Sequence, residues 1–355
     1  MSTSSSATLM TKGPIWKKII AFAIPLFLGN LFQQFYNTAD SLIVGNFLGS
    51  SALAAVSSSG NLIFLMVGFF NGLAVGAGVV VARYFGAKKF DLVQRAIHTI
   101  ITLGFFCGIA LTFVGVIAAP QILVLMGTPP EVLPNSVTYF RIYFCGSLAF
   151  VMYNFLVGIL QAVGDSRHPL MYLIISSVTN IILVAGFHFG VGAAALATVI
   201  SQCLSALLCF LHLLRGPKEY RIYLSKLRLD SLLLKQIISN GLPAGLQNSI
   251  ISLANVVVQS NINKFGQMAV AGCGSYSKIE GFAFLPITCF ALALTTFISQ
   301  NLGAKEYDRA KKGAVFGVIC SVVTSELVGV VIYTFAPYLI AAFNNTPDVL
   351  SYGVA

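Results

Sequence analysis

Nine long apolar stretches constrain this chain more than any other feature of its sequence. The hydrocarbon core of a bilayer is about 30 Å thick, and about 20 helical residues cross it. Each stretch has at least about that length, and helices satisfy their own backbone groups inside a membrane. The stretches cover residues 19–45, 52–82, 96–120, 137–162, 169–189, 191–214, 236–262, 268–300 and 313–343. The sequence therefore predicts an all-α, polytopic membrane protein.

The composition agrees with this fold class. Hydrophobic residues make up 57% of the chain and charged residues only 9%. A soluble domain carries about 25% charged residues, because its surface must be wetted. Most of the surface of this protein must instead face hydrocarbon, which argues against a soluble domain.

The formal net charge of +10 reflects membrane topology rather than a nucleic-acid partner. Of the 21 Lys and Arg residues, all but Arg141, Lys264 and Lys278 lie before the first apolar stretch or in alternate gaps. Basic residues collect on the cytoplasmic side of a membrane. We therefore predict a multi-pass protein of the inner (plasma) membrane with a cytoplasmic amino terminus, whose basic residues contact membrane lipids.

An internal repeat indicates how the helices are organised. At an offset of 218 residues, Pro25, Asn30 and Asn37 align with the second-copy residues Pro243, Asn248 and Asn255. At an offset of 217, the loop GAKKFD at 86–91 aligns with GAKEYD at 303–308. Both copies start on the same predicted side, so the repeats are expected to be parallel, related by an axis along the membrane normal.

The repeat also predicts the domains. Residues 1–215 are expected to form an amino-terminal six-helix lobe, followed by a cytoplasmic linker at 216–235. Residues 236–355 are expected to form a partial lobe of about three helices, without counterparts of the last three helices of the first copy. The expected fold is thus two parallel-repeat helical lobes, the second incomplete.

Several motifs together resemble the multidrug and toxic compound extrusion (MATE) family, and the resemblance covers essentially the whole chain. The first span carries a series of polar residues and leads into VGNFLG at 44–49. Loops read RYFGAK at 83–88, LQAVGDS at 160–166 and SQNLGA at 299–304. The resemblance implies a two-lobed, twelve-helix exporter that alternates between outward- and inward-facing states, driven by H⁺ or Na⁺. The chain departs from it by lacking the last three helices and by a fifth span about four residues short.

Asp40 is the candidate for ion coupling. It lies about twenty residues into the first apolar stretch, where an unpaired carboxylate costs about 2.5–3.5 kcal/mol and is functional by default. Asn30, Gln33 and Asn37 share a helical face with Asp40. This face should line the interior of the lobe, where an acid can exchange a proton or Na⁺. A position for Asp40 at the outer water interface is the alternative.

The resemblance implies partners for Asp40. The family's cation site uses an Asn on the fifth helix, often an Asp four residues later, and a Thr on the sixth helix. Asn180 matches the Asn, and Thr198 is the candidate for the Thr, whereas Val184 stands at the position of the acid. A site with one carboxylate favours a single H⁺ or weakens Na⁺ binding. Hydrogen bonding between helices is the alternative role for Asn180.

The second copy carries a polar stripe without an acid. Val258 takes the position of Asp40, so this stripe is expected to contact substrate or neighbouring helices. An aromatic lining for flat cationic substrates is a further expectation, with helix packing as the alternative. The aromatic candidates are Tyr36, Tyr153, Tyr276, Phe282 and Phe284. Further cavity candidates are Asn248, Ser252, Asn255, Gln259, Tyr36, Lys278 and Glu280.

The expected function is cation-coupled antiport that exports drugs or organic cations by alternating access. Its substrates would be small amphipathic or cationic molecules. A lipid-linked oligosaccharide flippase of the same fold is an alternative, although it should place several cationic residues in the cavity and only Lys278 lies clearly within a span. An inactive truncated remnant of a transporter is the other alternative.

Nothing in the sequence indicates an enzyme. Residues His98, His168, His188 and His212 fall at helix ends without metal-ligand spacing. The seven cysteines lie within apolar stretches and form no CxxC pair. We expect no cofactor other than the coupling ion, H⁺ or Na⁺, and no metal site other than Na⁺ at Asp40.

Overall fold

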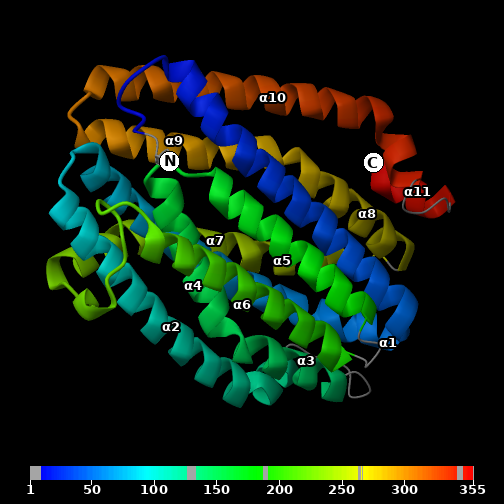
Figure 1. Ribbon diagram of the computed structural model, residues 1–355. Coiled ribbons are helices and arrows are strands. Elements are labelled where there is room, and N and C mark those ends of the chain that lie inside the picture. Colours follow the sequence, from blue (N-terminus) through cyan, green and yellow to red (C-terminus); the bar gives the residue numbers. More distant parts are fainter. Residues whose placement is uncertain are drawn as a thin grey trace.

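The computed structural model describes the backbone of residues 9–125, 133–186, 191–262, 265, 267–341 and 347–354 (Figure 1). Within these ranges some side chains lie outside the description, including all those of 36–66. The described residues form α-helices and one short 3₁₀ helix, and none of them is in a strand. The predicted all-α class is confirmed.

The helices follow one another with short connections. Seven described helical segments are long and apolar enough to cross a membrane, or eight if the bent pair α3–α4 counts as one span. The elements are α1 (Ile15–Gly86), α2 (Phe90–Leu125), α3 (Leu133–Cys145), α4 (Ser147–Ala162), α5 (Arg167–Gly186), α6 (Val191–Arg215), η1 (Leu224–Lys226), α7 (Ser231–Ile262), α8 (Gln267–Ala283), α9 (Leu285–Gly303), α10 (Tyr307–Ala341) and α11 (Pro347–Val354).

The first two predicted spans belong to one long helix. The backbone stays helical through residues 44–49, where the sequence predicted the boundary between the spans 19–45 and 52–82. Met10, just before α1, and Gly86, at its end, nevertheless both lie against Gln300 of α9. Helix α1 must therefore bend back on itself between its apolar halves, Ile15–Phe35 and Val67–Gly86.

Two other predicted spans are divided. Residues 137–162 fall into α3 and α4, whose axes meet at 48° beside Gly146. Residues 268–300 fall into α8 and α9, with Pro286 in the first turn of α9. Proline lacks an amide hydrogen and its ring displaces the preceding turn, which accounts for the second break.

The internal repeat is also a repeat of structure. Lys88 and Lys305, which align at the offset of 217, both adopt a left-handed φ, of 57° and 63°. Each lysine follows the end of a spanning helix and precedes another helix with an aspartate in its first turn. These aspartates are Asp91 in α2 and Asp308 in α10. Since both turns point the chain the same way, the predicted parallel relation of the two copies is confirmed.

The two copies meet where α1 and α9 end. Gly86 lies against the backbone of Gln300, and Gly303 lies against the carbonyl of Arg83. Adding the repeat offset of 217 to Gly86 and Arg83 gives Gly303 and Gln300, so the two contacts are equivalent. A two-fold axis between the copies requires this equivalence. We call this the basic end of the bundle, because Arg83, Lys88, Lys89 and Lys305 border the hollow between the two turns.

Glycines also let α1 and α7 approach closely. Gly72 and Gly76 of α1 lie directly against the α7 backbone at Gly245 and Gly241. Small residues four apart allow such close crossing of membrane helices, because no side chain separates the backbones. The second half of α1 thus packs on the first helix of the second copy.

The first half of α1 makes the complementary contact with α9. Ile19 and Phe22 are buried in one apolar cluster with Cys289 and Phe297 of α9. Each copy therefore packs its first span against the second span of the other copy. This exchange of contacts holds the two lobes together.

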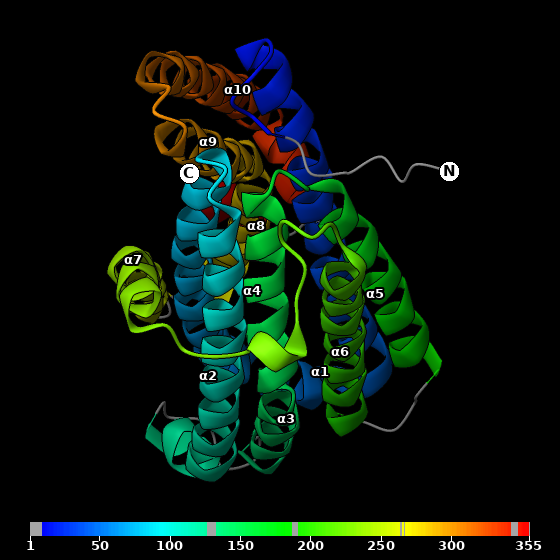
Figure 2. The same ribbon diagram turned by 60° about the vertical axis from the view of Figure 1, so that its left-hand side comes forward.

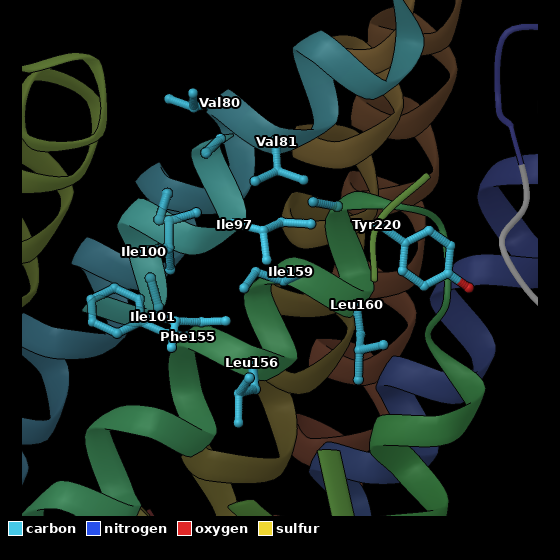
Figure 3. Close-up of a cluster of buried hydrophobic side chains, with 14 of the residues drawn as sticks. Val80, Val81, Ile97, Ile100, Ile101, Phe155, Leu156, Ile159, Leu160 and Tyr220 are labelled. Carbon is cyan, nitrogen blue, oxygen red and sulfur yellow. The ribbon is translucent and has the colours of Figure 1, made fainter. Parts of the chain in front are cut away.

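The largest apolar cluster lies inside the amino-terminal lobe. It joins the second half of α1 to α2 and α4, with Val81, Ile97 and Ile159 fully or almost fully buried (Figure 3). Tyr220 of the connection to α7 packs on the same cluster. The cluster fixes α1, α2 and α4 as a rigid unit.

The predicted linker at 216–235 is shorter than expected and is ordered. Helix α7 begins at Ser231, because the Asp230 carboxylate accepts from the backbone amides of Leu232 and Leu233 at 3.2 Å each and caps the helix. The segment crosses α4 and α2 on its way to α7 (Figure 2). The Arg95 guanidinium hydrogen-bonds Asp230 and holds the pKa of its carboxyl below the ordinary value. The pair therefore stays charged at neutral pH.

We expect Gly76→Leu to destabilise the protein, because a side chain there would meet the backbone of α7 at Gly241. Overpacking of this kind costs about 1–3 kcal/mol. Thermal unfolding in detergent should show a lower Tm. Gly329→Leu is the matched control, since no atom lies within 4 Å of a side chain begun at Gly329. Equal Tm values for the two variants would contradict the proposed crossing.

Candidate functional site

A cavity lies within the amino-terminal lobe and is bordered on one side by the second copy. Its volume is about 200 Å³, and its walls come from both halves of α1 and from α4, α5, α6 and α9. Leu292, Thr295 and Thr296 of α9 supply the wall from the second copy. None of the described residues that line it is charged. The cavity can therefore hold a molecule through amide, hydroxyl and aromatic groups rather than through fixed charges.

Some of the candidate residues line this cavity. Asn30 and Gln33, two residues of the predicted polar face, are in its wall, and so is Tyr153. Asn30 also donates to the Cys289 thiol at 3.3 Å and so bridges to the second copy. The side chains of several other candidates lie outside the description, namely Asp40, Asn37, Tyr36, Gln259 and Lys278.

Four amide side chains of the cavity wall were not singled out from the sequence. They are Asn71 of α1, Asn154 and Gln161 of α4, and Gln202 of α6. Each is a polar residue within or at the end of an apolar stretch, and that signal could have identified them. The buried Oε1 of Gln202 has no hydrogen-bond partner among the described residues. It is an acceptor that a bound molecule could satisfy.

Asn180 and Thr198 come together, as the resemblance implied. The Asn180 Nδ2 donates to Thr198 Oγ1 at 3.4 Å, between α5 and α6. Asn180 is 1% exposed, and its Oδ1 has no hydrogen-bond partner among the described residues. A buried amide oxygen without a partner costs free energy, and it is a suitable ligand for a cation. Val184, at the position of the missing acid, is buried as well.

The stripe on α7 contacts α1 rather than the cavity. Asn248 Nδ2 donates to the Gly68 carbonyl at 3.0 Å. Ser252 donates back to its own helix at the Asn248 carbonyl, at 2.8 Å. Asn255 is exposed. The stripe was expected to contact either substrate or neighbouring helices. Its described residues support contact with a neighbouring helix, α1.

Glu280, the remaining candidate, lies on α8. It accepts a hydrogen bond from Tyr276 Oη at 3.4 Å on the same helix. Glu280 is not among the residues that line the cavity.

Side chains of the second copy close the basic end around Met10. Gln300 is fully buried, and it accepts from the Met10 amide at 2.8 Å while donating to the Ala162 carbonyl at 2.8 Å. The Arg309 guanidinium donates to the Met10 carbonyl at 3.0 and 3.2 Å. The backbone of Met10 is therefore held through both its amide and its carbonyl by the second copy.

The histidines are not all isolated, contrary to expectation. His168 and His212 lie beside each other with ring centroids 4.2 Å apart, and both approach the Asp165 carboxylate. The two histidines are far apart in the sequence, so spacing alone did not indicate the cluster.

Comparison with protein families identifies a matching model. The MatE family model matches residues 25–185 and 243–355. The probable multidrug resistance protein YoeA of Bacillus subtilis is 30% identical over 354 residues, which cover 96% of this chain and 76% of the relative. The FAD transporter of Shewanella oneidensis is 25% identical over 358 residues, covering 97% and 77%.

A solved structure shares the fold. It shows the outward-facing conformation of a multidrug resistance MATE family transporter of the MOP superfamily. The TM-score is 0.92 at 25% identity, and the match covers 100% of this chain and 80% of the other.

Gln300→Leu should open the basic end, because it leaves the Met10 amide and the Ala162 carbonyl without partners. Each unpaired buried group costs about 1–3 kcal/mol. We expect faster hydrogen exchange at the Met10 amide, measured by mass spectrometry of amino-terminal peptides, and a lower Tm.

Gln247→Leu is the control, because this glutamine is exposed on α7. Unchanged protection of the Met10 amide in Gln300→Leu would show that Gln300 does not hold the amino-terminal segment.

Proposed function

The chain belongs to the MatE family, and from this premise we propose that it is a secondary active transporter that exports small amphipathic or cationic molecules in exchange for H⁺ or Na⁺. It is an integral membrane protein of a family of transporters, not an enzyme. Its multidrug relatives support drug export as the general activity. Cation coupling, the substrate class and the orientation are the proposal.

The uncharged cavity of the amino-terminal lobe, which the second copy borders on one side, is the observation that carries the proposal. Substrate sites of transporters lie near the bilayer midplane at the interface of repeats. Here amides and Tyr153 share the wall with leucine, valine and glycine. Such a wall suits a molecule with a flat apolar body and a few polar atoms.

The absence of charge on the described walls favours some substrates over others. An anionic cargo would be expected to meet lysine or arginine, yet none of the described wall residues is basic. This weighs against a flippase for lipid-linked oligosaccharides. It also weighs against a dinucleotide such as the one named for the FAD transporter of Shewanella oneidensis.

Asp40, Asn180 and Thr198 are the proposed coupling residues. The Asn180 Oδ1 has no hydrogen-bond partner among the described residues, which supports a role in the coupling site. An amide oxygen can ligate Na⁺ or accept a hydrogen bond from a protonated carboxyl. Asp40 would supply the negative charge from the first span. Since Val184 is apolar, one carboxylate serves the site, which favours a single H⁺ over Na⁺.

The closed basic end supports alternating access. Gly86 and Gly303 cross there, and Gln300 seals the gap. We propose that the basic end faces the cytoplasm of the cell, as the distribution of lysine and arginine indicates. The described conformation is then closed to the cytoplasm, and export requires the contacts at Gly86, Gly303 and Gln300 to separate.

Asp40→Asn should abolish export driven by an ion gradient, because a neutral amide cannot exchange a proton. Asn180→Ala should weaken it while leaving insertion intact. Dye transport in inside-out vesicles, with a pH or Na⁺ gradient imposed separately, measures both effects and identifies the ion.

Glu326→Gln is the matched control. It removes one negative charge, as Asp40→Asn does, but from an exposed residue of α10. Export by Asp40→Asn at the wild-type rate would refute the coupling role. Loss of export in Glu326→Gln, with export retained in Asp40→Asn, would assign the coupling role to Glu326 of α10.

A further inference from the structure

Three ligand-type side chains converge at the basic end of the amino-terminal lobe. Asp165 lies in the turn between α4 and α5, His168 in the first turn of α5, and His212 in the last turn of α6. Asp165 Oδ2 is 2.7 Å from His168 Nδ1 and 3.6 Å from His212 Nε2. One ligand atom from each residue lies within 4.8 Å of the others. The transport mechanism above does not use these groups.

The turn that carries Asp165 presents its carboxylate inward. Gly164 has a φ of 87°, a left-handed conformation in which other residues are strained. The Asp165 side chain is 1% exposed, and its Oδ1 accepts from the His168 amide at 3.2 Å. That bond ties one oxygen to the start of α5. The second oxygen, Oδ2, faces the two imidazoles.

Tyr172 orients one imidazole. Its Oη lies 3.0 Å from His212 Nδ1. In the tautomer that carries its hydrogen on Nδ1, the imidazole donates this hydrogen to the tyrosine oxygen. The Nε2 lone pair then faces Asp165 and His168. Metal-ligating histidines almost always use their second ring nitrogen in this way, which fixes the tautomer and the ring.

We propose that Asp165, His168 and His212 form a binding site for a divalent transition-metal ion, with Zn²⁺ as the best match. Two imidazoles and a carboxylate are ligands that Zn²⁺ accepts, and a fourth position is left for water. With metal–ligand distances of about 2.0–2.2 Å, tetrahedral ligand atoms lie about 3.3–3.6 Å apart. The Asp165–His212 separation already has this value, and the Asp165–His168 separation needs to lengthen by less than about 1 Å.

The site would join elements that border the cavity. Ser166, next to Asp165, lines the cavity, and so does Ala162, whose carbonyl accepts from Gln300. A bound metal would tie this turn to the end of α6. The side-chain exposures of His168 and His212, 30% and 17%, leave room for the ion to enter from the aqueous side.

Metal binding by the full-length chain tests the proposal without any transport assay. The protein is purified in detergent without a polyhistidine tag, treated with a chelator, and titrated with Co²⁺ and then Zn²⁺. We expect one Co²⁺ per chain with the visible absorption of a tetrahedral site, displaced by one Zn²⁺. A wild-type protein that binds no stoichiometric metal overturns the proposal, and then Asp165 and the histidines form only an ion-paired cluster.

Variants assign the ligands. His212→Gln and His168→Gln should each weaken binding by more than about tenfold, and Tyr172→Phe, which keeps all three ligands, by about 10- to 100-fold. His98→Gln is the control, because His98 is engaged by the Gln94 carbonyl and the Tyr223 amide on α2 and the linker. Wild-type affinity in both His168→Gln and His212→Gln would also overturn the proposal, since the metal would then bind elsewhere.

Discussion

The close approach of two helix backbones at Gly86 and Gly303 is the constraint on which the rest of the structure depends. Any side chain at either position would collide with the backbone of the other copy. Because α1 and α9 meet there without side chains between them, the amino-terminal segment and α4 come within reach of Gln300. The two-fold relation of the copies, the path of α1 and the closed basic end all follow from this crossing.

The closure and the cavity use different chemistry. At the basic end, the buried amide of Gln300 and the half-buried guanidinium of Arg309 hold the backbone of Met10 with directional hydrogen bonds. In the cavity, the described polar groups are uncharged, and the Oε1 of Gln202 has no hydrogen-bond partner among the described residues. Groups that are fully bonded stabilise one conformation, whereas groups with free bonding capacity can bind a ligand. This division fits the proposed alternating-access transport.

Much of the fold could be predicted from the sequence, because apolar length and repeated Pro, Asn and Gly residues are local signals. The continuous helical backbone of α1 could not, since the sequence predicted two separate spans at 19–45 and 52–82. Part of the cavity wall could be predicted, because Asn30 and Gln33 share a helical face that the helical periodicity of the sequence reveals. Gln202 and Asn71 lie on helices whose inward faces are set by packing against other helices, α6 within its own lobe and α1 also against α7. The cluster at Asp165 joins residues from two helices, which no spacing along the chain indicates.

A reversible cross-link across the basic end tests the central claim most directly. Ala87 and Ala304, the equivalent residues that follow Gly86 and Gly303, both border the hollow between the two turns. Cysteines are placed at these two positions in a chain whose seven native cysteines are replaced. The pair is joined with a short bifunctional thiosulfonate, and dye transport is measured before cross-linking, after it, and after reduction. The account predicts that cross-linking stops transport and reduction restores it. Full transport by the cross-linked protein would show that the two copies need not separate there.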